Sequence, residues 1–292
     1  MFKFKCSQKV YDIGGVKVGG APWENPPVLI GSIFYHKHKI VKDEKSGEFD
    51  KNTAEELIKT VEDISNKTKL PAMLDVVIAS PNAAIKYLDF VSNTTKMPIL
   101  VDALSTDAMG VAFKHVRDVG LLDRVVFNSL NAKSKDDEFK LLQEYGIKAS
   151  VLLLYTERVV DVDIRMKNLE LLLEKSKVYG IEKILVDTFV IDVPSLSAAM
   201  KTLLEIKSRY GLPCGAGAHN AISSQRKSFK ERFGLEGTKA CELASNLATI
   251  VMGADFLLYG PIETAKEVFP AVYTIYTSYR YLGRRKDLLI EI

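Results

Sequence analysis

The chain has 292 residues, with 40 Lys and Arg against 37 Asp and Glu, a formal net charge of +3, and 47% hydrophobic residues. This composition is typical of a globular protein and excludes a fibrous or disordered chain. So balanced a charge gives no block of basic surface of the kind that binds nucleic acid, and we set that class of partner aside.

The cysteines, the opening residues and the late apolar segment indicate the cellular compartment in which the protein is expected. Cys6, Cys214 and Cys241 are odd in number and unevenly spaced, which fits free thiols in a reducing compartment better than disulfides. The opening residues carry charges where a signal peptide needs an apolar stretch, and the most apolar late segment, residues 243–261, is interrupted by Asp255. We therefore expect a cytoplasmic protein with no membrane-inserted segment.

The first predicted element is a β-hairpin over residues 10–20, which turns at Gly14 and Gly15. Paired glycines are typical of tight turns. The segment has neither the Gly-x-Gly-x-x-Gly pattern nor the lysine of a phosphate-binding loop. Residues 1–27 are therefore expected to form a cap on the domain that follows.

Eight short apolar runs come next, separated by amphipathic stretches, and they predict buried strands. The strands are expected at residues 28–34, 72–79, 98–102, 124–128, 149–155, 183–190, 213–218 and 254–259. A spacing of about 25 to 45 residues is typical of strand–helix units, and eight such units close a TIM (β/α)8 barrel. We therefore predict one such barrel domain over residues 1–292, with the hairpin closing its N-terminal mouth.

Helices are predicted between the strands from their starting and stopping residues. The clearest are expected at about residues 51–64, 166–179, 193–210 and 262–281. The last carries a stripe of aromatic side chains, including Phe269 and Tyr276. Such a stripe is typical of a core or of a contact between two copies, so a homodimer is expected.

Polar side chains follow several of the predicted strands. Asp102, Asn128 and Asp187 each end an apolar run, and Asn220 comes just after another. The carboxyl ends of barrel strands line the active face. One aspartate there would be unremarkable as a helix cap, but four polar groups meeting in a dry pocket need a ligand with many donors and acceptors. A planar heterocycle such as a pterin meets that need.

Cys214, His219 and Cys241 present a zinc-binding alternative. Their spacing lacks a close Cys-x-x-Cys pair, and Cys241 falls within a predicted helical stretch. A cysteine in such a place is commonly a small buried hydrophobic residue, and we predict no metal. The charged run at residues 226–232 is expected to be a solvated loop, with contact to the acidic tail of the ligand or to an acidic partner as the alternatives.

Two segments resemble a known family. The sequence GSIFYHKHKIVKD at residues 31–43, continuing to GEFD at 47–50, is similar to the H subunit of tetrahydromethanopterin S-methyltransferase, as is GGVKVGGAP at 14–22. The similarity continues through Asp102 and Asn128 to the last strand. More remotely, the family resembles the pterin-binding barrels of methyltetrahydrofolate:corrinoid methyltransferases.

The resemblance implies a function and roles for these residues. Asp102, Asn128 and Asp187 match ligands of the pterin ring, and Asn220 matches the catalytic asparagine near N5. The reaction implied is methyl transfer between N5 of a tetrahydropterin and the cobalt of a methylated corrinoid protein. Because residues 22–26 depart from the glycine-containing version usual in the archaeal family members, tetrahydrofolate is the expected carrier, with tetrahydromethanopterin as the alternative.

The chain has no Asp-x-His-x-x-Gly corrinoid motif, so the corrinoid is expected on a partner protein that docks over the barrel mouth. His38 either lines that mouth or bonds to backbone. Two other functions stay open. One is a pterin-condensing enzyme like dihydropteroate synthase, which would need Arg and Lys for a diphosphate. The other is a non-catalytic docking subunit of a methyltransferase complex.

Overall fold

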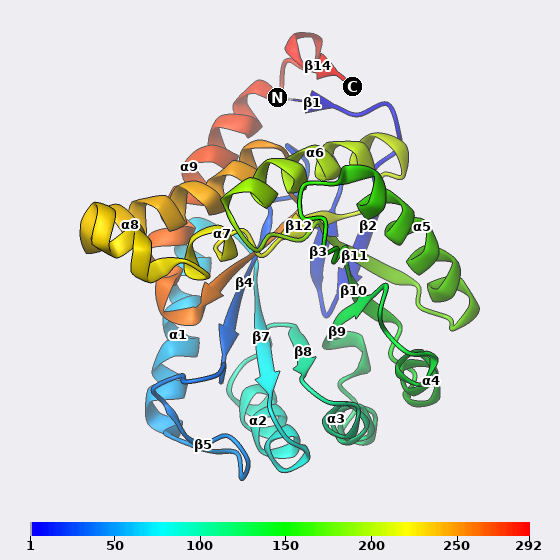
Figure 1. Ribbon diagram of the computed structural model, residues 1–292, viewed down its shortest axis with the longest axis vertical. Coiled ribbons are helices and arrows are strands. Elements are labelled where there is room, and N and C mark those ends of the chain that lie inside the picture. The colour runs from blue at the N-terminus through cyan, green and yellow to red at the C-terminus, as the bar shows by residue number, and fades with distance from the viewer. Residues whose placement is uncertain (1) are drawn as a thin grey trace.

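The computed structural model describes residues 2–292, and in it eight parallel strands close into a barrel surrounded by helices (Figure 1). Around the wall the strands are β4 (Val28–Ile33), β7 (Ala72–Ile78), β8 (Ile99–Ala103), β9 (Val125–Asn131), β10 (Ala149–Leu153), β11 (Lys183–Asp187), β12 (Cys214–Ala216) and β13 (Phe256–Pro261). Each overlaps a predicted strand. The predicted TIM barrel is therefore confirmed.

The outer layer of the barrel is helical. Its helices are α1 (Lys51–Thr68), α2 (Pro81–Thr94), α3 (Thr106–Asp118), α4 (Asp136–Tyr145), α5 (Val162–Val178), α6 (Val193–Arg209), α7 (Asn220–Ser223), α8 (Arg226–Val251) and α9 (Ala265–Leu282), with 3-10 turns at Leu122–Arg124, Ile262–Thr264 and Lys286–Leu288. Side-chain caps fix where several begin, as Asp50 does for α1 by accepting a hydrogen bond from the Thr53 N–H. The four predicted helices all lie at these positions.

The predicted β-hairpin is present, and it lies at the N-terminal end of the barrel. It pairs β2 (Val10–Ile13) with β3 (Val16–Gly19), and both turn glycines have positive φ. Ile13 and Val18 pack against inward-facing side chains of the strands, such as Met73. The inside of the barrel is therefore sealed at this end.

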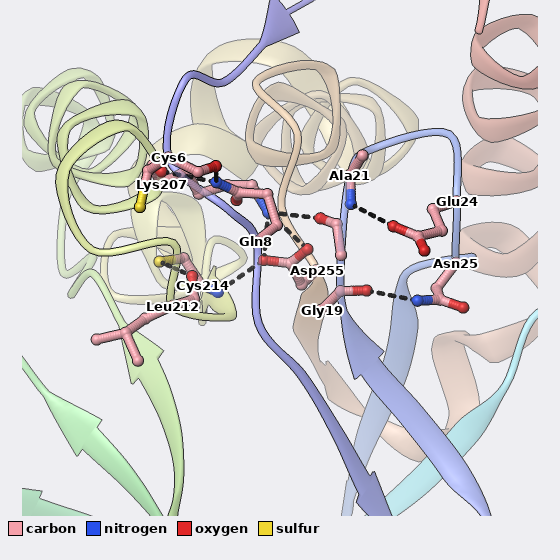
Figure 2. Close-up of polar contacts among 11 residues, drawn as sticks. Cys6, Gln8, Gly19, Ala21, Glu24, Asn25, Lys207, Leu212, Cys214 and Asp255 are labelled. Carbon is pink, nitrogen blue, oxygen red and sulfur yellow. Dashed lines mark hydrogen bonds and ion pairs between the residues drawn. The ribbon is translucent and has the colours of Figure 1, made fainter.

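Next to Gly20, which follows the hairpin, a buried ion pair joins Lys207 of α6 to Asp255, the residue before β13 (Figure 2). Lys207 Nζ lies 2.7 Å from each carboxylate oxygen of Asp255 and donates a third hydrogen bond to the Gly20 carbonyl. The Cys214 N–H donates to Asp255 as well, and Gln8 donates to the Lys207 carbonyl. Both charges are thus paired, and they tie the N-terminal segment to the barrel.

Two further two-stranded sheets lie outside the barrel. The first pairs β5 (Val41–Asp43) with β6 (Glu48–Phe49) in the connection that follows β4. The second pairs β1 (Phe2–Lys3) with β14 (Ile290–Glu291), so the two ends of the described chain lie side by side. Among residues 2–292, no helix combines the length and apolar character needed to cross a membrane.

The structure overturns the prediction for residues 226–232 and refines the prediction for the aromatic stripe of α9. Residues 226–232 are not a solvated loop but the first turns of α8, in which Phe229 and Phe233 pack together one helical turn apart. The many charges obscured that spacing in the sequence. The aromatic stripe of α9 is split, because Phe269 and Tyr276 are buried whereas Tyr273 and Tyr281 are exposed.

Candidate active site

A cavity of about 360 Å³ opens at the carboxyl ends of the strands, and all four residues predicted for the site line it. Its lining has three carboxyl groups and no Lys or Arg within residues 2–292. The lining residues are Ser32, Asp75, Asp102, Asn128, Ser129, Leu153, Asp187, Phe189, Val190, Gly217, His219, Asn220 and Leu258. The structure therefore brings Asp102, Asn128, Asp187 and Asn220 together.

Asp75 of β7 is a site residue that the sequence analysis missed. Its side chain is 4% exposed and accepts hydrogen bonds from Ser32 Oγ at 2.7 Å and from Asn128 Nδ2 at 3.0 Å. Burial raises the pKa of Asp75, and these two donors oppose the shift. Since the amide N–H of Asn128 is engaged here, its carbonyl oxygen is left for a ligand in the cavity.

Asp102 at the end of β8 faces the cavity with no hydrogen-bond partner of its own in the described chain. It does not cap α3, because Ser105 accepts from the Ala108 N–H in that role. Burial, followed by the neighbouring charge of Asp75, raises the pKa of Asp102 well above its ordinary value. Asp75 has two donors that favour its charged form and Asp102 has none, so the upward shift of the pKa is greater for Asp102.

Asp187 is the last residue of β11, and its carboxylate also stabilises the turn that follows the strand. It accepts from the Phe189 N–H at 2.8 Å, and Phe189 has a φ of 65°, a left-handed conformation that is strained for a bulky residue. Burial raises the pKa of Asp187 to about 6, although the Phe189 N–H and the Arg165 charge oppose it. Asp187 is therefore ionised at neutral pH.

Arg165 of α5 packs against the turn that follows Asp187. Its guanidinium is fully buried and donates to the carbonyls of Thr188 and Val159, and it lies over the Phe189 ring at 5.6 Å. Burial lowers the pKa of Arg165 to about 10, so it keeps its charge at neutral pH. Arg165 therefore ties Thr188, which follows Asp187, to Val159 in the loop between β10 and α5.

Asn220 and His219 form the wall of the cavity beyond β12. Asn220 is the first residue of α7, and its side-chain oxygen Oδ1 accepts a hydrogen bond from Ser223 Oγ at 3.3 Å. His219 Nδ1 lies 3.0 Å from the Leu258 carbonyl oxygen, so this nitrogen carries the proton and Nε2 is the acceptor. Burial lowers the pKa of His219, which keeps the ring neutral.

His38 does not line the cavity. It is 2% exposed, its Nδ1 accepts from the Phe34 N–H, and its Nε2 lies 3.1 Å from Glu263. The backbone-bonding alternative for His38 is thus the one that holds.

Within residues 2–292, no group of three or more His, Cys, Asp or Glu side chains is arranged to hold a metal ion. Burial raises the pKa of the Cys214 thiol well above its ordinary value, and the thiol donates to the Leu212 carbonyl. Cys214 is thus poorly suited to act as a thiolate ligand.

Comparison with known proteins places the chain. The model of the tetrahydromethanopterin S-methyltransferase MtrH subunit family matches residues 6–292. The chain belongs to this family. Related H subunits of that methyltransferase include those of Methanopyrus kandleri, 40% identical over 285 residues (91% of this chain, 88% of the relative), and Methanothermobacter thermautotrophicus, 38% identical over 286 residues (93% and 91%). The H subunit of a putative methyltransferase mtx from Methanosarcina mazei is 34% identical over 283 residues, covering 92% of this chain and 90% of the relative.

The solved structures most like this MtrH family member in fold include dihydropteroate synthases. The Yersinia pestis enzyme superposes with a TM-score of 0.63 at 12% identity, covering 94% of this chain and 99% of that one. The Coxiella burnetii enzyme, in complex with pteroic acid, gives a TM-score of 0.61 at 17% identity, covering 94% and 100%. At such identities the likeness shows the barrel fold alone. The resemblance to the MtrH family predicted from residues 14–50 is confirmed.

Proposed function

We propose that this chain binds a tetrahydropterin in the cavity at the barrel mouth and moves a methyl group between its N5 and the cobalt of a corrinoid on a partner protein. The observation that carries the proposal is the lining of the cavity: three carboxyls and two carboxamides without a cation. A reduced pterin presents amino and ring N–H donors beside carbonyl and ring-nitrogen acceptors, which such a set complements.

The surroundings of each side chain suggest its role in binding the ring. Asp187, ionised at neutral pH, accepts from the N–H donors of the ring. The carboxyl of Asp102, which has a raised pKa and no partner of its own in the described chain, binds a polar edge of the ring, and the free side-chain oxygen of Asn128 accepts a hydrogen bond. The ring is thus bound by groups of fixed and different character.

Asn220 is the residue proposed to act on N5. A neutral, methylated N5 is a poor site for displacement, so a proton or strong hydrogen bond must reach it when the methyl group leaves, and must be released when it arrives. The corrinoid, when bound by the partner, supplies a cobalt that accepts or gives up the methyl group. Asn220 and His219 both line the cavity, which supports a role for the Asn220 amide in holding the N5 proton.

The identity of the carrier is the next part of the proposal. The names of the relatives favour tetrahydromethanopterin over the tetrahydrofolate expected from residues 22–26. We propose tetrahydromethanopterin as the carrier, with tetrahydrofolate as the competitor in the test below.

For assembly, we propose that a corrinoid protein docks over the cavity mouth and that two copies of the chain meet through α9. The exposed Tyr273 and Tyr281 of that helix support a contact between copies. Light scattering of the purified chain, with Tyr273→Lys and Tyr281→Lys as the disrupting pair, tests the second point.

Binding and transfer together test the function. Calorimetry with each reduced carrier is expected to show one-to-one binding, tighter for tetrahydromethanopterin, and addition of methylcobalamin is expected to give methyl transfer followed by the cobalt spectrum. Binding without transfer, even with the corrinoid partner present, would indicate the docking subunit. Condensation of a pterin diphosphate would indicate the synthase, which the absence of Arg and Lys from the cavity lining disfavours.

A further inference from the structure

The mouth cavity has polar groups for the edges of a flat ring, but such a ring also needs a surface for one of its faces. Among the residues of the described chain, 2–292, that line the cavity, Phe189 is the only Phe, Tyr or Trp. It follows the last residue of β11 by two positions, and its N–H donates to the Asp187 carboxylate at 2.8 Å. Because aromatic side chains commonly bind flat heterocycles by stacking, Phe189 is the candidate for that surface.

Packing inside the protein does not account for the Phe189 side chain. Phe189 is 8% exposed, yet it belongs to none of the hydrophobic clusters that residues 2–292 form. Its ring meets the Tyr155 ring edge to face, with the centroids 5.2 Å apart, and the Arg165 guanidinium lies over it at 5.6 Å. The guanidinium covers one face of the ring, and Phe189 borders the cavity on another side.

The backbone at Phe189 has a conformation that a bulky residue rarely adopts. Its φ of 65° lies in the left-handed region that favours glycine. The preceding residue is held firmly, because Thr188 donates to the Gly215 carbonyl from its N–H at 2.9 Å and from Oγ1 at 3.2 Å, and its own carbonyl accepts from Arg165. A glycine at position 189 would avoid the strain, so a phenylalanine there indicates that its side chain is needed where this turn puts it.

We propose that Phe189 binds a face of the pterin ring and is presented to it by the left-handed turn after β11. This inference rests on the proposed function and adds a preference for flat ligands to the contacts at the ring edges. Asp187 connects the two parts, since a carboxylate has room for several donors. It accepts the Phe189 N–H, and in the proposed function it also accepts from the ring edge. A ring bound by Asp187 thus lies beside the residue that fixes its face.

The test separates the ring of Phe189 from the turn that carries it. The dissociation constant of 6-methyltetrahydropterin is measured by calorimetry on the full chain for Phe189→Gly, Phe189→Ala and Phe189→Leu, together with the unfolding temperature of each. Phe189→Gly removes the ring and suits the left-handed backbone, whereas Phe189→Ala removes the ring and keeps the strain. Phe233→Ala on α8, an exposed position outside the mouth cavity, is the matched control.

We expect Phe189→Gly and Phe189→Ala to bind about tenfold more weakly than the wild-type chain, Phe189→Leu to lie between them and wild type, and Phe233→Ala to match wild type. Phe189→Gly should unfold at a higher temperature than Phe189→Ala, so it decides the outcome even if the alanine variant fails to fold.

The inference is overturned if Phe189→Gly stays within threefold of wild type, because the turn alone would then account for binding. It is also overturned if Phe189→Leu binds as tightly as wild type, since any apolar side chain would then suffice, or if Phe233→Ala loses as much as Phe189→Gly. Failure of the wild-type chain to bind 6-methyltetrahydropterin would instead contradict the proposed function.

Discussion

Buried carboxyl groups lie at both ends of the barrel, but their hydrogen-bond and charge partners differ. At the N-terminal end, Asp255 receives hydrogen bonds from Lys207 and from the Cys214 N–H, and the hairpin seals the space above. At the carboxyl end, Asp102 faces a cavity without a partner of its own in the described chain, next to a second carboxyl, Asp75. Burial raises the pKa of both Asp102 and Asp255, but only Asp255 is compensated by a cation.

The comparison shows how to tell a structural buried charge from a functional one. A charge that the fold itself neutralises contributes to the integrity of the native state, and removing one partner leaves the other unpaired. A buried carboxyl without a partner destabilises the folded state, and a ligand that hydrogen-bonds to it offsets this loss on binding. Substitutions at the two ends should therefore separate stability from binding.

The largest effect is expected at the N-terminal end. Asp255→Ala leaves Lys207 charged and buried, and should lower the free energy of unfolding by about 3–5 kcal/mol, measured with denaturant. The double variant Asp255→Ala with Lys207→Met should recover most of that loss, because no buried charge remains. Equal losses in the single and double variants would show that the ion pair is not the cause.

The next effect is on rate. Asn220→Ala should lower kcat by about 10² or more, since one preorganised hydrogen-bonding group is worth about 2.7–4 kcal/mol in the transition state. Single-turnover transfer from methylcobalamin measures it, and pterin affinity should change less. Ser223→Ala, which removes only the hydroxyl that donates to Asn220, is the matched control and should stay within a few-fold of wild type.

The third effect is on pH dependence. The pKa of Asp187 is raised to about 6 in the folded chain, so between about pH 4 and pH 6 the folded state holds a proton that the unfolded state has lost. The free energy of unfolding should therefore fall as the pH rises through this window, with a contribution from Asp187 of about 3 kcal/mol. Asp187→Asn should lack that contribution, and unfolding curves that run parallel across this range would contradict it.

The smallest effect is expected at Asp102, where two substitutions distinguish a role in pterin binding from a role in helix capping. Asp102→Ala should weaken pterin binding by about 1.5–3 kcal/mol without a loss of stability. Ser105→Ala, three residues away, removes the true cap of α3 and should lower stability by about 1 kcal/mol while binding stays unchanged. The opposite assignment of the two effects would make Asp102 a structural residue.

Much of the barrel was predictable because its strands are short, apolar and evenly spaced, and because a parallel strand buried on both faces leaves that record in the sequence. The ends of the strands were less accurate. The strand at 124–128 was expected to stop at Asn128, yet β9 continues to Asn131, where it still pairs with Leu153 of β10. Such an extension depends on a neighbour far away in sequence.

The site was predictable only where polar residues end apolar runs. That pattern identifies Asp102, Asn128 and Asp187, whereas Asp75 lies inside β7 and the pattern indicates only a strand there. A lone aspartate in an otherwise apolar strand is itself a signal, because a buried charge needs a partner. Its partners, Ser32 and Asn128, are 43 and 53 residues away and come together only in the closed barrel.

The pairing of β1 with β14 brings the two ends of the described chain together. Phe2 lies beside Ile290, and the Lys5 N–H donates to the Ile292 carbonyl, so both ends of the described chain leave the fold at one place. That place adjoins the segment held by Gln8 and Lys207, on the side of the barrel away from the cavity mouth. A protein immobilised on a surface by either end would present its cavity to solution, so that the proposed corrinoid partner could reach every immobilised molecule in the same orientation.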